Sequence, residues 1–221
     1  MSLLKAIQTI KLNLGSDVKL IAVTKKRSVR EINQLIFLGV KDIGESQVQE
    51  AEEKKSLIKE QVNWHLIGHL QRNKIKQAVE IFDMIQSVDS YKLAKKINSV
   101  CKSKNKVMAV LVQVNIAKEP QKYGLMEEEV IPFLKSLFEF KNIKILGLMT
   151  IAPFIKPEET RTYFRKMKHL FNKIQKENLS GIEMKYLSMG MTNDYKVAIQ
   201  EGSNMARIGT AIFREVQKPS S

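Results

Sequence analysis

The sequence predicts a single parallel α/β barrel over residues 1–221. Short β-rich runs alternate with helical patterns along the whole chain, and most of these runs are continuously apolar, as in strands buried on both faces of a parallel sheet. Eight such runs favour a sheet closed into a (β/α)8 barrel. An open doubly wound sheet is the alternative. We prefer the barrel because no G-x-G-x-x-G follows the first run, where a dinucleotide-binding sheet would carry it.

The expected strands are short runs rich in β-branched and apolar residues. They cover residues 19–24, 42–45, 63–68, 83–88, 106–114, 143–150, 184–189 and 205–210. Residues 1–15 mix Lys and Gln into an apolar pattern at helical spacing, which predicts an extra N-terminal helix docked on the barrel rather than a secretory signal.

Capping patterns mark the helices between these strands. Ser28 with Glu31 forms a capping-box pattern, and Gly39 suits the end of the same helix. Ser46 with Gln49 offers a second cap, with Gln in the N3 position. One long helix near the C-terminus carries an apolar stripe, made of Tyr163, Phe164, Met167, Leu170, Phe171 and Ile174.

Charge and cysteine content limit the possible partners and compartment. The net charge is +14, which suits a polyanion, but the lysines are scattered without interleaved aromatics, so a solvated basic surface is expected and no specific nucleic-acid partner. The longest apolar runs, such as residues 107–112, fall far short of the roughly 20 residues that span a bilayer, so no membrane partner is expected. The lone Cys101 lies on an apolar helical face and is expected to be buried, which favours a cytoplasmic protein.

Lys25 is the first candidate for chemistry. It directly follows the apolar run 20–24, so it is expected at the C-terminal end of the first strand, the end at which barrels place their functional groups. An amine partly desolvated among apolar walls has a lowered pKa and can attack an aldehyde to form an imine. The alternative is that Lys25 only begins a basic loop with Lys26 and Arg27.

Two loops near the C-terminus predict a phosphate site. Ser188, Gly190 and Thr192 lie where the seventh strand leads into a short helix, and Gly209 and Thr210 follow the eighth strand. Small residues let backbone N–H groups approach an anion, and hydroxyls add further donors. Taken singly, each segment could be an ordinary helix cap or turn. Together, on adjacent strands, they favour a phosphate cup.

The histidines carry a weaker signal. Trp64 and His65 are consecutive on an expected strand, so one faces the barrel interior and the other the helices, and the sequence leaves open which. His65 is expected to pack beside the site. His69 is four residues from His65, but the two do not share a helix, so they do not predict a metal pair.

These motifs resemble those of the pyridoxal phosphate homeostasis proteins, whose chains are similar to the N-terminal domain of alanine racemases. The resemblance covers almost the whole chain. It rests on residues 22–25, 43–46, 48–50, 64–71, 73–74, 147–149, 188–194 and 207–213. It implies a type III pyridoxal phosphate barrel. The family usually has Asn at the position of Ser46 and Ser at that of Thr192, and the second change keeps the hydroxyl.

The resemblance also implies roles for individual residues. It makes Lys25 the imine lysine, Arg207 the partner of the pyridine nitrogen, and Ser46 and His65 neighbours of the cofactor. The phosphate contacts that it implies are Ser188, Gly190, Met191, Thr192, Gly209 and Thr210.

The expected function is to hold pyridoxal 5′-phosphate and to act in its intracellular homeostasis or delivery, without a dedicated catalytic activity. Arg207 cannot give the ring nitrogen a readily shared proton, which makes the cofactor a weak electron sink. The alternatives are a weak amino acid racemase, or another pyridoxal phosphate enzyme, and a polyanion-binding module. Racemases of this barrel type take a tyrosine base from a second domain, for which the eight residues after Phe213 leave no room. The expected partners are apo pyridoxal phosphate enzymes and free amino acids, and a monomer is expected.

Overall fold

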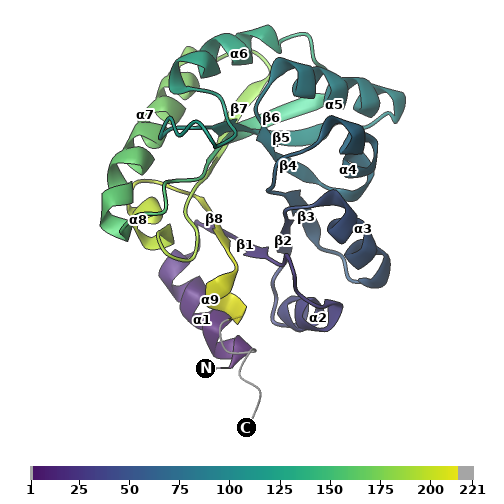
Figure 1. The fold of residues 1–221 in the computed structure, drawn as a ribbon, viewed down its shortest axis with the longest axis vertical. Coiled ribbons are helices and arrows are strands. Elements are labelled where there is room, and N and C mark those ends of the chain that lie inside the picture. Colours follow the sequence, from purple (N-terminus) through teal and green to yellow (C-terminus); the bar gives the residue numbers. More distant parts are fainter. Residues whose placement is uncertain (1, 214–221) are drawn as a thin grey trace.

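The computed structural model describes residues 2–213, and Met1 and residues 214–221 lie outside the described part. Eight parallel strands follow one another around a closed barrel, and the first strand pairs with the last. Helices surround the strands (Figure 1). The predicted (β/α)8 barrel is confirmed.

All eight expected strands are present, with ends that differ from the expected ones by at most two residues. They are β1 Lys19–Val23, β2 Asp42–Glu45, β3 Asn63–Leu66, β4 Met84–Val88, β5 Met108–Val114, β6 Ile143–Thr150, β7 Ile182–Ser188 and β8 Met205–Ile208. Their register is that of a parallel barrel: Ala22 of β1, for example, pairs with Ile43 of β2 and Ile208 of β8.

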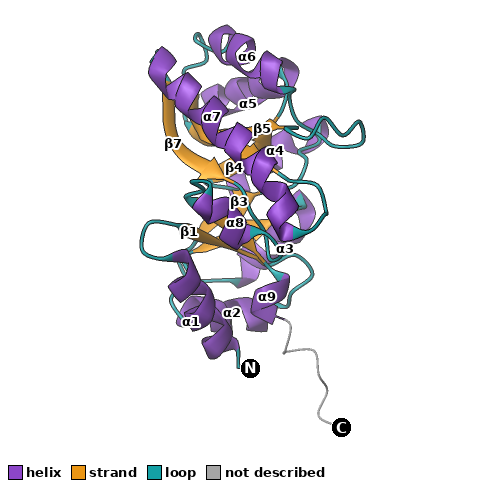
Figure 2. Cartoon of the chain, turned by 90° about the vertical axis from the view of Figure 1, so that its left-hand side faces the viewer, coloured by secondary structure: helices purple, strands orange, loops and turns teal. Residues whose placement is uncertain are grey.

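The helices follow the strands in alternation, and one additional helix precedes them. They are α1 Leu3–Leu14, α2 Val29–Phe37, α3 Val48–Leu57, α4 Ile75–Ile81, α5 Tyr91–Ser103, α6 Val130–Ser136, α7 Arg161–Glu177, α8 Tyr195–Gln200 and α9 Thr210–Phe213. Short 3-10 turns occur at η1 Arg72–Lys74, η2 Glu127–Glu129 and η3 Pro157–Thr160. Figure 2 shows α1, α2 and α9 together at one end of the molecule, where α1 packs against α9.

One of the two predicted caps is confirmed and the other is wrong. Ser28 and Glu31 form the reciprocal capping box of α2, and Gly39 adopts a φ of +76° just after this helix. Helix α3, however, has Gln47 as its N-cap residue, without a side-chain cap bond, so Ser46 precedes the cap. The shift makes Glu50 the N3 residue in place of Gln49, and the Glu50 carboxylate binds the Lys26 N–H and Lys54 instead of its own helix end.

Two apolar layers hold the barrel together. The outer layer lies between strands and helices and includes the predicted stripe of α7, of which Phe164, Met167 and Ile174 are almost completely buried. The inner layer fills part of the barrel with six side chains: Ile21, Met84, Leu111, Leu146, Met149 and Met205. Each fully buried side chain of this size stabilises the fold by roughly 1.5–3 kcal/mol. Cys101 is buried in the outer layer, as predicted.

Candidate functional site

A cavity of about 900 Å³ opens at the C-terminal ends of the strands. It is formed by the loops after β1, β2, β5, β6, β7 and β8, at the face on which parallel barrels carry their functional groups. The residues of the predicted site that line it are Lys25, Ser46, Met191, Thr192, Arg207, Gly209 and Thr210. Three other predicted site residues, His65, Ser188 and Gly190, do not line it and are described below.

Lys25 is the second residue after β1 and lines the cavity with an exposed side chain. The expectation of a partly desolvated amine is therefore not met, because the open mouth of the cavity leaves this side chain in contact with solvent. The next residue, Lys26, has a φ of +59°, a left-handed conformation that costs a non-glycine residue roughly 1–2 kcal/mol. Strain of this kind persists only where neighbouring contacts impose it.

A buried charge cluster lies beneath this loop. Thr24 donates to Glu45 Oε1 at 2.6 Å, and the Lys54 ammonium lies 2.7 Å from the same oxygen. Lys54 also donates to the Thr24 carbonyl at 2.7 Å and to Glu50 at 2.6 Å. Burial raises the pKa of Glu45 above its usual value, although Lys54 and Thr24 act in the opposite direction. The cluster thus binds the backbone on both sides of Lys25, through the Thr24 carbonyl and through the Lys26 N–H, which donates to Glu50.

Arg207, on β8, supplies a buried cation on the cavity wall. Its side chain is 3% exposed, NH1 donates to the Ser188 hydroxyl and NH2 to the Thr150 carbonyl, both at 2.7 Å. Burial lowers the pKa of Arg207 to about 10, with the charge of Asp194 acting in the other direction, so the guanidinium remains protonated at neutral pH. A guanidinium has only N–H donors and accepts no hydrogen bond.

The loops after β7 and β8 are tied to each other. Thr192 Oγ1 accepts from the Ala211 N–H at 3.2 Å, and the Arg207 N–H donates to the Gly190 carbonyl at 3.0 Å. Gly190 has a φ of +90°, and a Cβ at this position would lie 2.6 Å from the Cβ of Ala198. Gly190 therefore shapes the turn that leads into α8 rather than the cavity wall. The two loops predicted to form a phosphate cup do lie side by side.

His65 faces the barrel interior, and Trp64 belongs to the apolar layer between strands and helices. The His65 ring lies 3.0 Å from Asp42 and 3.2 Å from the Gln86 amide nitrogen, and it is separated from the cavity by Gln86 and Ser188. His69 stacks on Tyr123 with ring centroids 3.8 Å apart. Residues 2–213 contain no cluster of three or more His, Cys, Asp or Glu side chains placed to hold a metal ion.

The sequence did not point to several residues of the site. Lys122 lines the cavity and donates to the Ala152 carbonyl at 3.1 Å, and the apolar segment 151–155 forms another part of the wall. Phe154 in this segment is 89% exposed. Lys122 lies in a loop without local pattern, but the sixth strand ending in Met149 and Thr150 could have pointed to the segment that follows it.

Comparisons with known proteins identify the family of this chain. The family model described as alanine racemase, N-terminal domain, matches residues 2–216. A pyridoxal phosphate homeostasis protein of Aquifex aeolicus is 38% identical over 199 residues, which cover 89% of this chain and 86% of that protein. Its counterpart in Schizosaccharomyces pombe is 32% identical over 212 residues, which cover 93% and 88% of the two chains.

Solved structures of related proteins have the same fold. PipY of Synechococcus elongatus, solved with pyridoxal phosphate (PLP) bound, matches with a TM-score of 0.89 and 30% identity over 96% of this chain and 100% of that chain. An alanine racemase of Clostridium difficile shares the fold, with a TM-score of 0.79 and 19% identity over 96% of this chain and 56% of the racemase. The chain belongs to the pyridoxal phosphate homeostasis protein family and has the barrel of the alanine racemase N-terminal domain.

Proposed function

We propose that this protein binds PLP as an imine on Lys25 and holds it for intracellular homeostasis or delivery. The observation that carries the proposal is the meeting of three chemical groups in one cavity: the amine of Lys25, the buried guanidinium of Arg207 and the hydroxyls of Thr192 and Thr210. PipY, a structural relative at 30% identity, was solved with PLP bound, which supports the same ligand here.

The groups in the cavity suit PLP. When bound, PLP supplies an aldehyde to an amine and an electron-poor ring to attached groups. Lys25 supplies an amine to the cavity wall just after β1, and Ser46 lines the cavity just after β2, the neighbouring strand. Thr192 and Thr210 offer hydroxyl donors to a phosphate, beside the small residue Gly209. At Gly209 a Cβ would lie 3.1 Å from Val23 Cβ, so a larger residue would crowd the end of β1.

Arg207 favours a holder of the cofactor over a catalyst. A buried guanidinium with a pKa of about 10 donates a hydrogen bond to a ring nitrogen but transfers no proton to it at neutral pH. An unprotonated ring draws electrons weakly, which limits side reactions at an attached amino acid. The second candidate is a weak amino acid racemase, favoured by the barrel shared with alanine racemase.

The same proposal includes the partners. Apo PLP enzymes and free amino acids are the acceptors and donors of the cofactor, the protein acts in the cytoplasm, and it acts as a monomer. No helix within residues 2–213 has the length and apolar character needed to cross a bilayer. The basic surface is a solvated one and has no specific nucleic-acid partner.

A transfer experiment separates the two candidate functions. PLP-loaded protein is mixed with an apo PLP enzyme, with and without a trap that consumes free PLP, and racemisation is measured over a panel of amino acids. A holder reactivates the enzyme in the presence of the trap and shows no appreciable racemisation. If the trap abolishes reactivation and racemisation reaches about 1 per second or more, the racemase is the better assignment.

A further inference from the structure

A continuous polar chain crosses the barrel beneath the cavity. Arg207 NH1 donates to Ser188 Oγ at 2.7 Å, Ser188 Oγ donates to Gln86 Oε1 at 2.7 Å, and Gln86 Nε2 lies 3.2 Å from His65 Nδ1. The side chains come from β8, β7, β4 and β3, and their exposures do not exceed 3%. Four strands therefore supply one connected set of buried groups.

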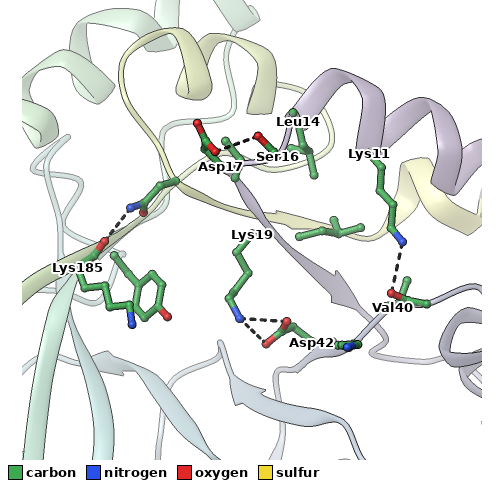
Figure 3. A pocket seen from close by; sticks show the side chains of 15 residues that line it. Lys11, Leu14, Ser16, Asp17, Lys19, Val40, Asp42 and Lys185 are labelled. Carbon is green, nitrogen blue, oxygen red and sulfur yellow. Dashed lines mark hydrogen bonds and ion pairs between the residues drawn. The ribbon is translucent and has the colours of Figure 1, made fainter.

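The chain continues to the opposite face of the barrel. His65 Nε2 lies 3.0 Å from Asp42 Oδ1, which also accepts from Asn63 at 2.9 Å. Lys19 donates to both Asp42 oxygens, at 3.1 and 3.2 Å. Figure 3 shows this ion pair in a second cavity, of about 490 Å³, which is lined by Lys19 and Asp42 at the N-terminal ends of β1 and β2. The polar chain thus joins the two faces of the barrel.

The orientation of the Gln86 amide gives every bond in this chain a direction. A guanidinium only donates, so the Ser188 oxygen accepts from Arg207, and the Ser188 hydroxyl donates to Gln86 Oε1. The Gln86 amide then presents its NH2 group to His65, whose Nδ1 must accept. The remaining ring proton is on Nε2 and points to the Asp42 carboxylate, which only accepts when ionised. The charge of Arg207 thereby selects the Nε2–H tautomer of a histidine three hydrogen bonds away.

We infer that Gln86 and His65 are positioning residues for Arg207, and that they form with Ser188 a relay that has two discrete hydrogen-bonding states. In the first state His65 is neutral and every donor points from Arg207 toward Asp42. In the second state His65 carries protons on both nitrogens, which forces the Gln86 amide to rotate and removes the acceptor of the Ser188 proton. The inference rests on the proposed function, because it assigns Arg207 to the cofactor ring.

The relay couples Arg207, the proposed partner of the cofactor ring, to the N-terminal face of the barrel. The charged groups around His65 are Asp42 from β2 and Lys19 from β1, and Arg207 from β8 acts through Ser188 and Gln86. A change at Arg207, such as acceptance of its free N–H groups by a ring nitrogen, changes the strength of each bond in an aligned series. Coupling is reciprocal, so protonation of His65 must alter cofactor binding by the same factor by which cofactor alters that protonation.

NMR of the imidazole groups tests the relay without any measurement of activity. The chain has 3 histidines, so the His65 signals can be assigned from His69→Gln and His169→Gln variants. In the cofactor-free protein we expect the nitrogen shifts of a neutral Nε2–H tautomer. Ser188→Ala should change this tautomer and with it the nitrogen shifts of His65. The matched control is Ser87→Ala. Ser87 is next to Gln86 in the chain and as completely buried as Ser188, but it donates to the Gly68 carbonyl, so its removal should leave the His65 signals unchanged.

A second variant keeps the side-chain volume and reverses one bond. In Gln86→Glu the carboxylate still accepts from Ser188 but cannot donate to His65 Nδ1, so His65 should take up a second proton at neutral pH. A merely structural role for Gln86 does not produce this change. An Nδ1–H tautomer in the parent protein, or His65 signals that respond to neither Ser188→Ala nor Gln86→Glu, would overturn the inference.

Addition of PLP separates the inference from the proposed function. If the imine absorbance band forms, and PLP shifts the His65 signals in the parent protein but not in Ser188→Ala, the relay and the proposed function are both supported. If the band forms and the His65 signals stay in place, the relay is wrong and the binding site stands. If no band forms on any lysine, the proposed function fails, while the tautomer of the cofactor-free protein still decides whether the relay exists.

Discussion

Lys54 donates a 2.7 Å hydrogen bond to the carbonyl of Thr24. Thr24 immediately precedes Lys25, so a buried lysine on α3 fixes the backbone from which the proposed imine lysine extends. The same ammonium is paired with Glu45, and both side chains are almost completely shielded from solvent, with exposures of 8% and 0%. Lys25 is thus exposed itself but anchored from below.

Removal of the Lys54 charge should be strongly destabilising. Lys54→Met leaves Glu45 buried without its cation, and loss of one partner from a buried ion pair costs about 3–5 kcal/mol. The double variant Lys54→Met with Glu45→Gln removes both charges and should recover a large part of this loss. Urea unfolding of the two variants and the parent measures the effect. Equal loss in the single and double variants would mean that the ion pair is not the source of the stability.

The hydroxyls at the ends of β7 and β8 should contribute to cofactor retention. Thr192→Val and Thr210→Val keep the shape of the side chain and remove the hydroxyl. Each hydrogen bond to a charged phosphate is worth about 1.5–3 kcal/mol, so each variant should bind PLP roughly 10- to 150-fold more weakly. Equilibrium dialysis measures the affinity, with Thr162→Val as the control because Thr162 is exposed on α7, outside the cavity. Unchanged affinity in both site variants would place the phosphate elsewhere.

Asp42 should make stability depend on pH in the acid range. Burial alone would raise the pKa of Asp42, but the hydrogen bond from His65 and the charge of Lys19 outweigh burial and hold this pKa below its usual value. A carboxyl with a depressed pKa in the folded protein stabilises the fold above its unfolded pKa, and this contribution is lost as the pH falls through the folded value. Asp42→Asn should therefore lower the unfolding free energy by about 1–3 kcal/mol at pH 7.

The stability difference between the parent and Asp42→Asn at acid pH tests the direction of this effect. As the pH falls below about 4, the ordinary pKa of an aspartate, the difference between the parent and Asp42→Asn should shrink, because Asp42 becomes protonated in the parent as well. Urea unfolding at several pH values follows the difference. A gap that stays constant from pH 7 to pH 3 would show that the carboxylate charge contributes nothing.

Gly190 should tolerate no side chain. Gly190→Ala places a Cβ 2.6 Å from Ala198 and adds the strain of a φ of +90°, so the loop after β7 must shift. The matched control is Gly181→Ala, which has a φ of +79° but meets nothing within 4 Å. The control should lower the unfolding free energy only by the cost of the left-handed backbone, about 1–2 kcal/mol. Gly190→Ala should lower it by about 1–3 kcal/mol more, because its Cβ meets Ala198. Similar melting curves for both variants would contradict the close packing of this turn on α8.

Much of the fold could be predicted because barrel strands carry strong local signals. The apolar runs around Ile21, Val110 and Leu146 located strands to within two residues, and Ser28 with Glu31 marked the start of α2. The cap predicted at Ser46 is wrong because the signal depends on one residue of register, and Gln47 takes the cap position without any side-chain bond. A one-residue difference of this kind is decided by tertiary contacts, here those of Glu50 with Lys26 and Lys54.

The site could be predicted only where a residue follows a strand. Lys25 and Thr210 follow strands and line the cavity, whereas Arg207 lies within β8 and its role was implied only by the family resemblance. The interior positions were harder, because strand alternation places one of Trp64 and His65 inside without saying which. Ser188, expected at the phosphate, instead bridges Arg207 and Gln86. Gln86 itself gave no signal, because its partners are 21 and 102 residues away in the chain.

The most direct test of the central claim is the identity of the lysine that carries the cofactor. PLP-loaded protein is reduced with borohydride, which converts an imine to a stable amine, then digested and mapped by mass spectrometry. We expect one adduct on Lys25, and we expect it to be absent from Lys25→Ala and unchanged in Lys26→Ala, whose substituted lysine lies one residue away on the same loop. A reduced adduct on Lys26 or Lys122 in the parent protein, with none on Lys25, would contradict the account.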